Sequence, residues 1–315
     1  MDITDNQLYT KEDIKLLSNC TLCPRECGVN RFRGGSGYCG TDAGYNIASI
    51  CIHTGEEPVI SGKNGICNIF FGSCNLRCIY CQNHEISRPG YITRQNFRAT
   101  GTILDFLVSI FERGISSVGF VSPSHLVPQV KAIIKGLHSR GIFPVTVYNT
   151  NGYDKVEVVG SLDGLINVWL PDYKYVSSAA AASYSDAADY PTVAIKALKE
   201  MYFQKGSTLH INDEGIADNG LIIRHLVLPG AAGASKKALR RIAEELSPGV
   251  HISLMSQYHP VAEVSDHPLL SRSLYMEEYQ AVVAEMERLG FRNGWVQDVD
   301  SYRHYRPDFS KDKPF

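Results

Sequence analysis

Short apolar runs alternate with amphipathic stretches along most of the chain. Six such runs predict strands and a seventh is weaker, at residues 66–71, 117–121, 143–148, 165–170, 221–228, 251–256 and 294–297. Stretches with helical spacing separate them, at residues 100–113, 126–139, 191–204, 235–246 and 275–289. In the second of these helices Val127, Val130 and Ile134 fall on one face, and Lys131 and Lys135 fall outside it. Repeated strand–helix units predict an α/β fold with a parallel sheet and right-handed crossovers.

Four regions depart from this alternation. Residues 2–17 predict a short helix, and residues 46–53 alternate in the manner of a further strand. Residues 177–188 are rich in Ala and Ser and predict a short helix or a surface loop. The polar residues 207–219 lead into the fifth strand and are expected to form a hairpin.

Length and charge narrow the class of protein. A chain of 315 residues, 44% hydrophobic and 20% charged, can bury a full core as one large domain with a small module, or as two domains. The net charge of -2 gives no basic excess, so we expect no nucleic-acid partner. No apolar run reaches the roughly 18 residues that a membrane span needs, and the polar N-terminus does not resemble a signal peptide.

The chain has nine cysteines, and seven of them lie in two tight clusters. Clustered cysteines in a chain without a signal peptide predict metal ligands rather than disulfides, and a reducing cytoplasmic location. Cys51 and Cys67 stand alone and are expected to be small core residues. His53 ends the strand at 46–53, and Glu56 and Glu57 follow it; a solvated loop is expected for all three, with a place facing the active site as the alternative.

The central cluster is Cys74, Cys78 and Cys81, in the spacing C-x3-C-x2-C directly after the strand at 66–71. Most iron–sulfur clusters are held by four cysteines. Three thiolates on one loop hold three corners of a cubic cluster and leave the fourth iron open to a small molecule, as in metal sites that keep an open position. A structural zinc loop and buried free thiols are the alternatives.

The N-terminal cluster is Cys20, Cys23, Cys27 and Cys39, in the spacing C-x2-C-x3-C-x11-C. Four thiolates predict a closed tetrahedral site with a structural role, or an electron relay if the metal is an iron–sulfur cluster. Spacing does not separate zinc from iron–sulfur. A metal-free knuckle and a pair of disulfides are the alternatives.

Polar residues follow the predicted strands at corresponding positions. The carboxyl ends of parallel strands share one rim, where the cysteine loop also lies, so these residues predict a site. The residues are Ser122, Ser124 and His125, then Asn149, Thr150 and Asn151, then Asp172 and Lys174, and finally His259.

The central cluster, with Tyr80 just before its last cysteine, resembles the radical S-adenosylmethionine (SAM) enzymes. Segments like Cys20–Gly28 and Gly37–Gly40 precede the core in a branch related to pyruvate formate-lyase activating enzymes. The likeness runs from Cys20 to about residue 297. It implies an open (β/α)6 partial TIM barrel at residues 59–300, an N-terminal Cys-rich module at 1–58 and a tail at 301–315, which is expected to pack over the barrel.

The resemblance also implies a reaction. The open iron of a [4Fe-4S] cluster would chelate SAM, and an electron from a donor such as flavodoxin or ferredoxin would cleave SAM. The resulting 5′-deoxyadenosyl radical would abstract hydrogen from a substrate. The branch suggests a backbone glycine of a glycyl radical enzyme. A small molecule or a protein side chain is the second option, and a non-enzymatic metal-binding or electron-transfer protein is the third.

Contacts to SAM follow from the resemblance residue by residue. Family members carry a Gly-Gly-Glu segment after the second strand, where this chain has Ser122, Ser124 and His125, so hydroxyls and backbone carbonyls must hold the SAM amino group instead. The segment Thr150–Gly152 is similar to one in the glycyl-radical activating enzymes that approaches SAM and a bound monovalent cation, and the match extends to Asn149. Asp172 would hold a cation or the ammonium group, and Lys174 would pair with the carboxylate; a surface ion pair is the alternative.

Three further residues complete the predicted SAM site. His259 would hydrogen-bond the ribose or the carboxylate, with a satisfied rim histidine as the alternative. Tyr80 and Asn83 flank the cluster and would contact the adenine, with a buried core tyrosine as the alternative.

Overall fold

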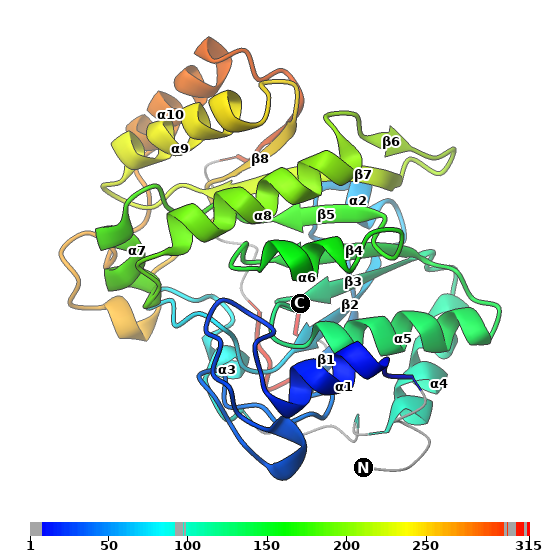
Figure 1. The fold of residues 1–315 in the computed structure, drawn as a ribbon. Helices are drawn as coiled ribbons and strands as arrows, with labels where there is room; N and C mark the ends of the chain where they lie inside the picture. The colour runs from blue at the N-terminus through cyan, green and yellow to red at the C-terminus, as the bar shows by residue number, and fades with distance from the viewer. Residues whose placement is uncertain (1–7, 92–96, 98, 299–300, 302–306, 312–313) are drawn as a thin grey trace.

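The computed structural model describes residues 8–91, 97, 99–298, 301, 307–311 and 314–315, and one large sheet organises them (Figure 1). Its strands are β1 (Ile47–His53), β2 (Ile66–Phe71), β3 (Ser117–Val121), β4 (Val145–Thr150), β5 (Val168–Pro171), β6 (His210–Ile211), β7 (Ala217–Leu226), β8 (His251–Met255) and β9 (Gly294–Val296).

The sheet confirms the predicted α/β fold. Its order is β1-β2-β3-β4-β5-β7-β8-β9, and every pair from β2 to β9 along this path is parallel. β1 pairs antiparallel with β2, and β6 pairs antiparallel with β7 as the predicted hairpin. The order begins at β1 and ends at β9 without pairing them, so the sheet formed by the described strands is open.

Helices connect the parallel strands, and α5, α6 and α8 lie in front of the sheet in Figure 1. Hydrophobic positions of α5 such as Val130, Ile134 and Leu137 are almost completely buried, as its helical spacing predicts. The longer helices are α1 (Lys11–Ser18), α4 (Thr100–Phe111), α5 (Val127–Ser139), α7 (Ser178–Ser185), α8 (Tyr190–Lys205), α9 (Ala232–Glu245) and α10 (Met276–Arg288), and the short ones are α2 (Pro58–Ser61), α3 (His84–Ser87), α6 (Val156–Gly160) and two 3-10 turns, Arg31–Arg33 and Ala262–Val264.

Several predicted boundaries were wrong. The strand expected at 143–148 is β4, which begins after Pro144 and includes Asn149 and Thr150. The strand expected at 165–170 begins later because the backbone N–H groups of Leu165 and Ile166 bond to Leu162 and close the preceding helical turn. β7 begins four residues early because its first residues pair with β6.

The N-terminal helix is shorter than expected. α1 begins after Thr10, whose hydroxyl accepts the backbone N–H of Asp13 while the Asp13 carboxylate accepts the backbone N–H of Thr10. This reciprocal cap fixes the start of the helix. Residues 2–7 of the predicted helix lie outside the described part of the chain.

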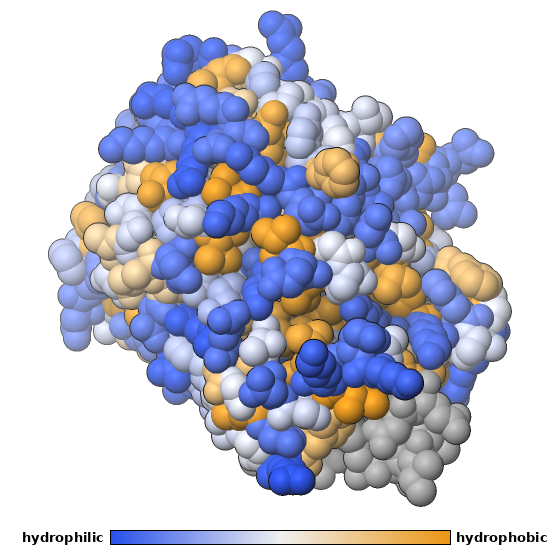
Figure 2. Space-filling model, in the orientation of Figure 1, coloured by the Kyte–Doolittle hydropathy of each residue, from blue (hydrophilic) through white to orange (hydrophobic). Residues whose placement is uncertain are grey.

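Polar side chains dominate the helical face of the molecule, with apolar residues scattered among them (Figure 2). No helix within the described residues is long and apolar enough to cross a membrane.

Candidate functional site

A cavity of about 460 Å³ lies inside the curve of the sheet. His53 at the β1 edge and Trp295 at the β9 edge both line it, so the sheet bends round the cavity. Cavities at the carboxyl ends of parallel strands are the usual binding sites of such folds. Most of the predicted site residues also line it, namely Cys74, Cys78, Cys81, Tyr80, Asn83, Ser122, Asn149, Thr150, Asn151, Asp172 and Lys174.

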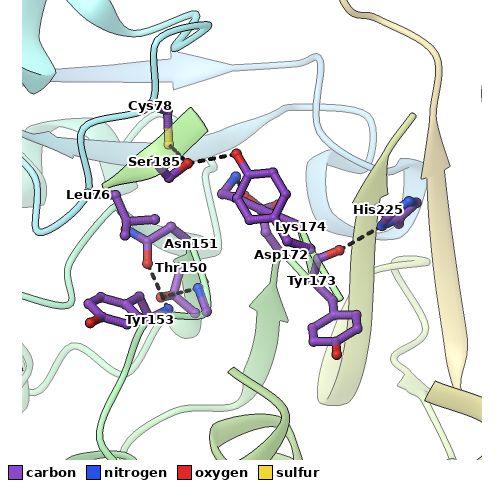
Figure 3. A network of polar contacts seen from close by, with 12 residues as sticks. Leu76, Cys78, Thr150, Asn151, Tyr153, Asp172, Tyr173, Lys174, Ser185 and His225 are labelled. Atoms are coloured by element: carbon purple, nitrogen blue, oxygen red, sulfur yellow. Dashed lines mark hydrogen bonds and ion pairs between the residues drawn. The ribbon is translucent and has the colours of Figure 1, made fainter. Parts of the chain in front are cut away.

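Hydrogen-bond donors surround the three thiols of the central cluster. The Leu76 backbone N–H lies 3.4 Å from the sulfur of Cys74. Ser185 donates to Cys78 over 3.0 Å (Figure 3), and Ser87 donates to Cys81 over 3.3 Å. Donors to ligand sulfurs are among the features that set the reduction potential of an iron–sulfur cluster. The donor set therefore fits a cluster at these three cysteines.

Burial raises the pKa of the Cys74 thiol to about 12 and that of Cys78 to about 11, and the Lys174 cation opposes the rise at Cys78. Metal ligation requires thiolates, so loading this site releases protons. As they stand, no three His, Cys, Asp or Glu side chains of the described residues are grouped closely enough to hold a metal ion. The metal sites therefore stay predictions. They require that the cysteine side chains turn toward one another when a metal binds.

Two cavity-lining serines have left-handed backbone conformations. Ser73 precedes Cys74 with φ +65°, and Ser122 follows β3 with φ +54°. Such conformations are unfavourable for residues other than glycine and concentrate at functional sites. The backbone N–H of Ser73 bonds to the Ile86 carbonyl over 2.7 Å, and that of Ser122 bonds to the Asn149 carbonyl over 2.9 Å. These bonds hold the strained turns in place.

Asn75 and Asn151 form a clamp beside Cys74. The Asn151 side-chain amide donates to the side-chain Oδ1 of Asn75 over 2.8 Å and to the Cys74 sulfur over 3.3 Å. Asn75 in turn donates to the Tyr153 carbonyl over 2.8 Å. Gly152 is required at this turn because a Cβ atom there would lie 2.3 Å from the Asp172 carbonyl oxygen, and its φ is +78°. The turn after β4 thus positions a donor on a predicted cluster ligand.

Replacing Asn151 with alanine is expected to lower the reduction potential of a bound cluster. The change removes the amide that donates to Cys74, and such bonds stabilise the more negative, reduced state. Potentiometric titration followed by electron paramagnetic resonance measures the shift. Asn64→Ala is the control, because the Asn64 amide bonds only to the exposed Gly114 carbonyl. Equal potentials in both variants would show that the Asn151 bond does not act on the cluster.

Asp172 and Lys174 form a partly buried ion pair, not the surface pair that was the alternative. Their side chains are 22% and 17% exposed, and the Lys174 ammonium lies 2.5 Å from the Asp172 carboxylate. Burial acts to lower the pKa of Lys174, but the charges of Asp172 and Cys78 outweigh it and hold that pKa well above its usual value. Lys174 therefore stays charged inside the cavity, close to the cluster loop (Figure 3).

A second charged group lines the cavity beside Asp172, which forms a β-bridge with Arg224, and its pairing could not be read from the sequence. Glu56 and Glu57, expected in a solvated loop, are mostly buried against Arg224 of β7. The Arg224 Nε lies 2.8 Å from Glu57 Oε1, and its Nη2 contacts both glutamates. Buried charges need partners of opposite sign, and here the Arg224 guanidinium and the two glutamate carboxylates neutralise each other. An arginine inside an otherwise apolar strand run was the available signal.

His53 was also expected in solvent but is buried at the cavity edge, and burial is the main cause that lowers its pKa. Its ring contacts Phe315, with centroids 4.0 Å apart. Phe315 and Phe309 both contact Phe70 of β2. The described part of the predicted tail therefore packs against the sheet as expected, while residues 302–306 and 312–313 lie outside the described chain.

Three predicted SAM contacts lie away from the cavity. Ser124 bonds to the Thr150 hydroxyl over 2.9 Å. His125 points its Nε2 at the Gly72 carbonyl over 3.0 Å, and burial lowers its pKa to about 4. His259 is nearly buried, with its Nδ1 3.5 Å from the Gln82 amide. The cavity walls do not include these residues, which fits the satisfied-histidine alternative for His259.

Tyr80 both lines the cavity and is buried. Its hydroxyl lies 2.5 Å from that of Tyr175, which lies 2.7 Å from Ser185, the donor to Cys78. Tyr80, which is predicted to contact the adenine, therefore also belongs to the hydrogen-bond chain that holds Ser185 against Cys78. His225, in contrast, has a structural bond from Nδ1 to the Tyr173 carbonyl over 2.6 Å (Figure 3).

The four N-terminal cysteines line a second, much smaller pocket. All nine cysteines of the chain are free, so the disulfide alternative is wrong. Burial is the main cause that raises the pKa of Cys23 to about 12, and Cys39, Cys20 and Cys27 add to it. The four thiols are therefore close enough to interact electrostatically. Cys51 and Cys67 are buried outside both sites, as predicted.

Comparison with known proteins gives a relative and several structures of partial likeness. No family model matches the chain. An uncharacterized protein of Methanocaldococcus jannaschii is 27% identical over 296 residues, which cover 91% of this chain and 80% of that protein.

A domain of a pyruvate-formate lyase-activating enzyme from Bacteroides vulgatus has a TM-score of 0.38 at 15% identity, covering 55% of this chain and 93% of that structure. The FeFe-hydrogenase maturase HydG of Carboxydothermus hydrogenoformans has a TM-score of 0.45 at 13% identity, covering 69% of this chain and half of that structure. The likeness at these TM-scores is partial, so the activity is argued below from the chain's own residues.

Proposed function

We propose that the protein is a radical SAM enzyme whose cavity holds a [4Fe-4S] cluster on Cys74, Cys78 and Cys81 together with SAM. The observation that carries this proposal is the shared cavity. Three thiols with hydrogen-bond donors, one buried and two partly buried, line the same space as the Asp172–Lys174 pair and the polar end of β4. A cluster bound there would supply the electron that cleaves SAM to methionine and a 5′-deoxyadenosyl radical.

Charge supports SAM as the occupant. Among the described residues that line the cavity are four carboxylates, from Glu56, Glu57, Asp172 and Asp298, and two cations, Lys174 and Arg224. The three thiolates add further negative charge once a cluster is loaded. SAM carries a sulfonium and an ammonium group against one carboxylate, so its net charge is positive. An anionic cavity with low-dielectric walls favours such a ligand.

Individual residues can orient the parts of SAM. Lys174 can pair with the SAM carboxylate through a charge-assisted hydrogen bond. Asp172 can accept from the ammonium group, which would then replace Lys174 as its partner. Ser122 and Asn149 lie at the ends of neighbouring strands and can take the place of the missing Gly-Gly-Glu acceptors. A reactive radical needs a site from which water is excluded, and the substrate, the N-terminal module or the tail would supply the cover.

The finer hypothesis is that the substrate is a protein, with hydrogen removed from a backbone glycine. Its support is the resemblance of the segments Cys20–Gly28 and Thr150–Gly152 to the activating-enzyme branch. A flavodoxin or ferredoxin would supply the electron. Nine free cysteines suit a reducing compartment such as the cytoplasm. A small-molecule substrate is the competing option within the same chemistry.

Anaerobic reconstitution with iron and sulfide, followed by SAM and a chemical reductant, tests the proposal. We expect the electron paramagnetic resonance spectrum of the reduced cluster to change on SAM addition, because SAM would bind the open iron. We also expect 5′-deoxyadenosine to accumulate. A spectrum indifferent to SAM, with no 5′-deoxyadenosine, would leave a metal-binding or electron-transfer protein as the better assignment.

A further inference from the structure

We propose that Cys20, Cys23, Cys27 and Cys39 bind a single divalent ion of the zinc class, and that this ion orders the loop that carries Cys74. The proposed site lies outside the cavity, so a test of metal binding there does not depend on whether the protein cleaves SAM. It selects among the three options that the cysteine spacing left open, namely zinc, iron–sulfur and no metal.

Size favours one ion over a cubic cluster. The pocket that these four cysteines line has a volume of about 10 Å³, close to the space of one water molecule. Gly37 also lies against Cys27, since a Cβ atom there would be 2.7 Å from the Cys27 sulfur. Four cysteines line this one small space, and their thiolates would match a closed tetrahedral zinc site once the side chains turn toward a bound ion.

Backbone donors already point at the ligand sulfurs. The N–H of Arg25 bonds to the Cys23 thiol, and the N–H of Tyr38 lies 3.3 Å from the Cys27 sulfur. Each donor belongs to a turn that brings one cysteine to the pocket. Hydrogen bonds of this kind stabilise thiolate charge and orient metal ligands.

Two arginines at the pocket indicate that its occupant is anionic. Arg31 is 2% exposed, and its donors bond only to uncharged oxygens, those of Asp42 and His125 backbone and of the Thr41 hydroxyl. Arg25 also lines the pocket, and its Nη2 is buried without a hydrogen-bond partner. Neither arginine forms an ion pair with a carboxylate of the described residues.

A buried guanidinium group without a counter-charge is costly, and this applies to Arg31. Arg25 is only partly buried, and its guanidinium lies 3.7 Å from the centroid of the Tyr38 ring. Four thiolates with one divalent cation carry a net charge of about -2, which two arginines balance. A loaded metal site would supply the counter-charge that no carboxylate of the described residues gives to Arg31, and an acceptor for the buried Arg25 Nη2.

The same residues connect the pocket to the cluster loop. The Arg25 Nε donates to the Asn75 carbonyl over 3.0 Å. His125 contacts the Gly72 carbonyl through Nε2, and its own carbonyl accepts from Arg31 over 2.7 Å. Gly72 and Asn75 flank Cys74 on both sides. Ordering the pocket therefore orders the backbone on which a cavity cysteine is held.

Metal binding is tested in a Cys74→Ser/Cys78→Ser/Cys81→Ser variant, which removes the cavity ligands and isolates the pocket. After chelator treatment and addition of zinc or cobalt(II), we expect one bound ion per chain, with the visible absorption of tetrahedral cobalt–thiolate. Adding Cys23→Ser should abolish binding, while adding Cys51→Ser should not. The proposal would be overturned if the starting variant bound no stoichiometric metal, or if metal binding survived Cys23→Ser. It would also be overturned if iron and sulfide filled the site instead.

A second variant guards against simple misfolding. Arg25→Gln keeps all four cysteines, and loss of a supporting group of this kind typically weakens metal affinity about 10–100-fold. Arg25→Lys should recover part of that loss. Hydrogen exchange of residues 72–76 in the isolated-pocket variant should slow when zinc is added. An affinity unchanged by Arg25→Gln, or exchange indifferent to zinc, would contradict the link to the cluster loop.

Discussion

Cys78→Ala is expected to abolish cluster loading: after anaerobic reconstitution the wild type should carry about four iron atoms in its cavity and the variant close to none. Two remaining thiolates would leave two irons of a cubic cluster without protein ligands. The variant should also lose the visible absorption of the cluster and all SAM cleavage. Iron and sulfide analysis, with 5′-deoxyadenosine measured by chromatography, checks the three outcomes together.

Cys67→Ala is the matched control for this prediction. Cys67 is completely buried in β2, only seven residues before Cys74, yet it lies outside both cysteine sites. The substitution removes a thiol from β2, the strand that leads into the cysteine loop, and leaves the loop itself unchanged. We expect this control to keep its iron. If Cys78→Ala retained full iron and SAM cleavage, the assignment of the three ligands would be wrong.

Local sequence determines the parts of this site that could be predicted. The spacing of Cys74, Cys78 and Cys81 places three thiols on one short loop, whatever the rest of the fold does. The strand pattern predicts a parallel sheet, and parallel strands bring their carboxyl ends together. Asn149, Thr150 and Asp172 therefore reach the cavity, even though the boundaries of their strands were misplaced by two or three residues.

Long-range packing determines the parts that could not be predicted. Glu57 and Arg224 are 167 residues apart in the sequence, and only the pairing of β1 with one edge of the sheet brings them together. His125 follows β3 as the predicted rim residues do, but its side chain lies in the pocket of the N-terminal cysteines. The sequence pattern predicts where a residue lies along a strand. The direction of a side chain such as that of His125 depends instead on which part of the chain packs against the turn after the strand.

Arg224→Met should destabilise the protein by about 3–5 kcal/mol near neutral pH, as breaking a buried ion pair from one side commonly does. The substitution keeps an apolar stem of similar length but leaves Glu56 and Glu57 buried without their cation. Their side chains are only 9% and 5% exposed, so water cannot replace the guanidinium. Urea unfolding followed by circular dichroism measures the loss.

The pH dependence of this loss identifies its cause. Burial acts to raise the pKa of Glu56, but Arg224 outweighs burial and holds that pKa below its ordinary value. In the wild type this carboxylate therefore stabilises the fold above its unfolded pKa of about 4.3, and the contribution disappears as the pH falls through the folded pKa.

Without Arg224, burial is the largest remaining influence on the pKa of Glu56, against the smaller effects of His53 and Asn68. We expect it to raise the folded pKa of Glu56 above the unfolded value, so the penalty grows as the pH rises. The gap between wild type and Arg224→Met should thus be widest near pH 7 and narrow toward about pH 4. Glu56→Gln/Glu57→Gln/Arg224→Met removes all three charges and should recover more than half of the loss, because neutral groups cost less to bury. A triple variant as unstable as Arg224→Met, with a gap indifferent to pH, would assign the effect to packing of the arginine stem instead of to its charge.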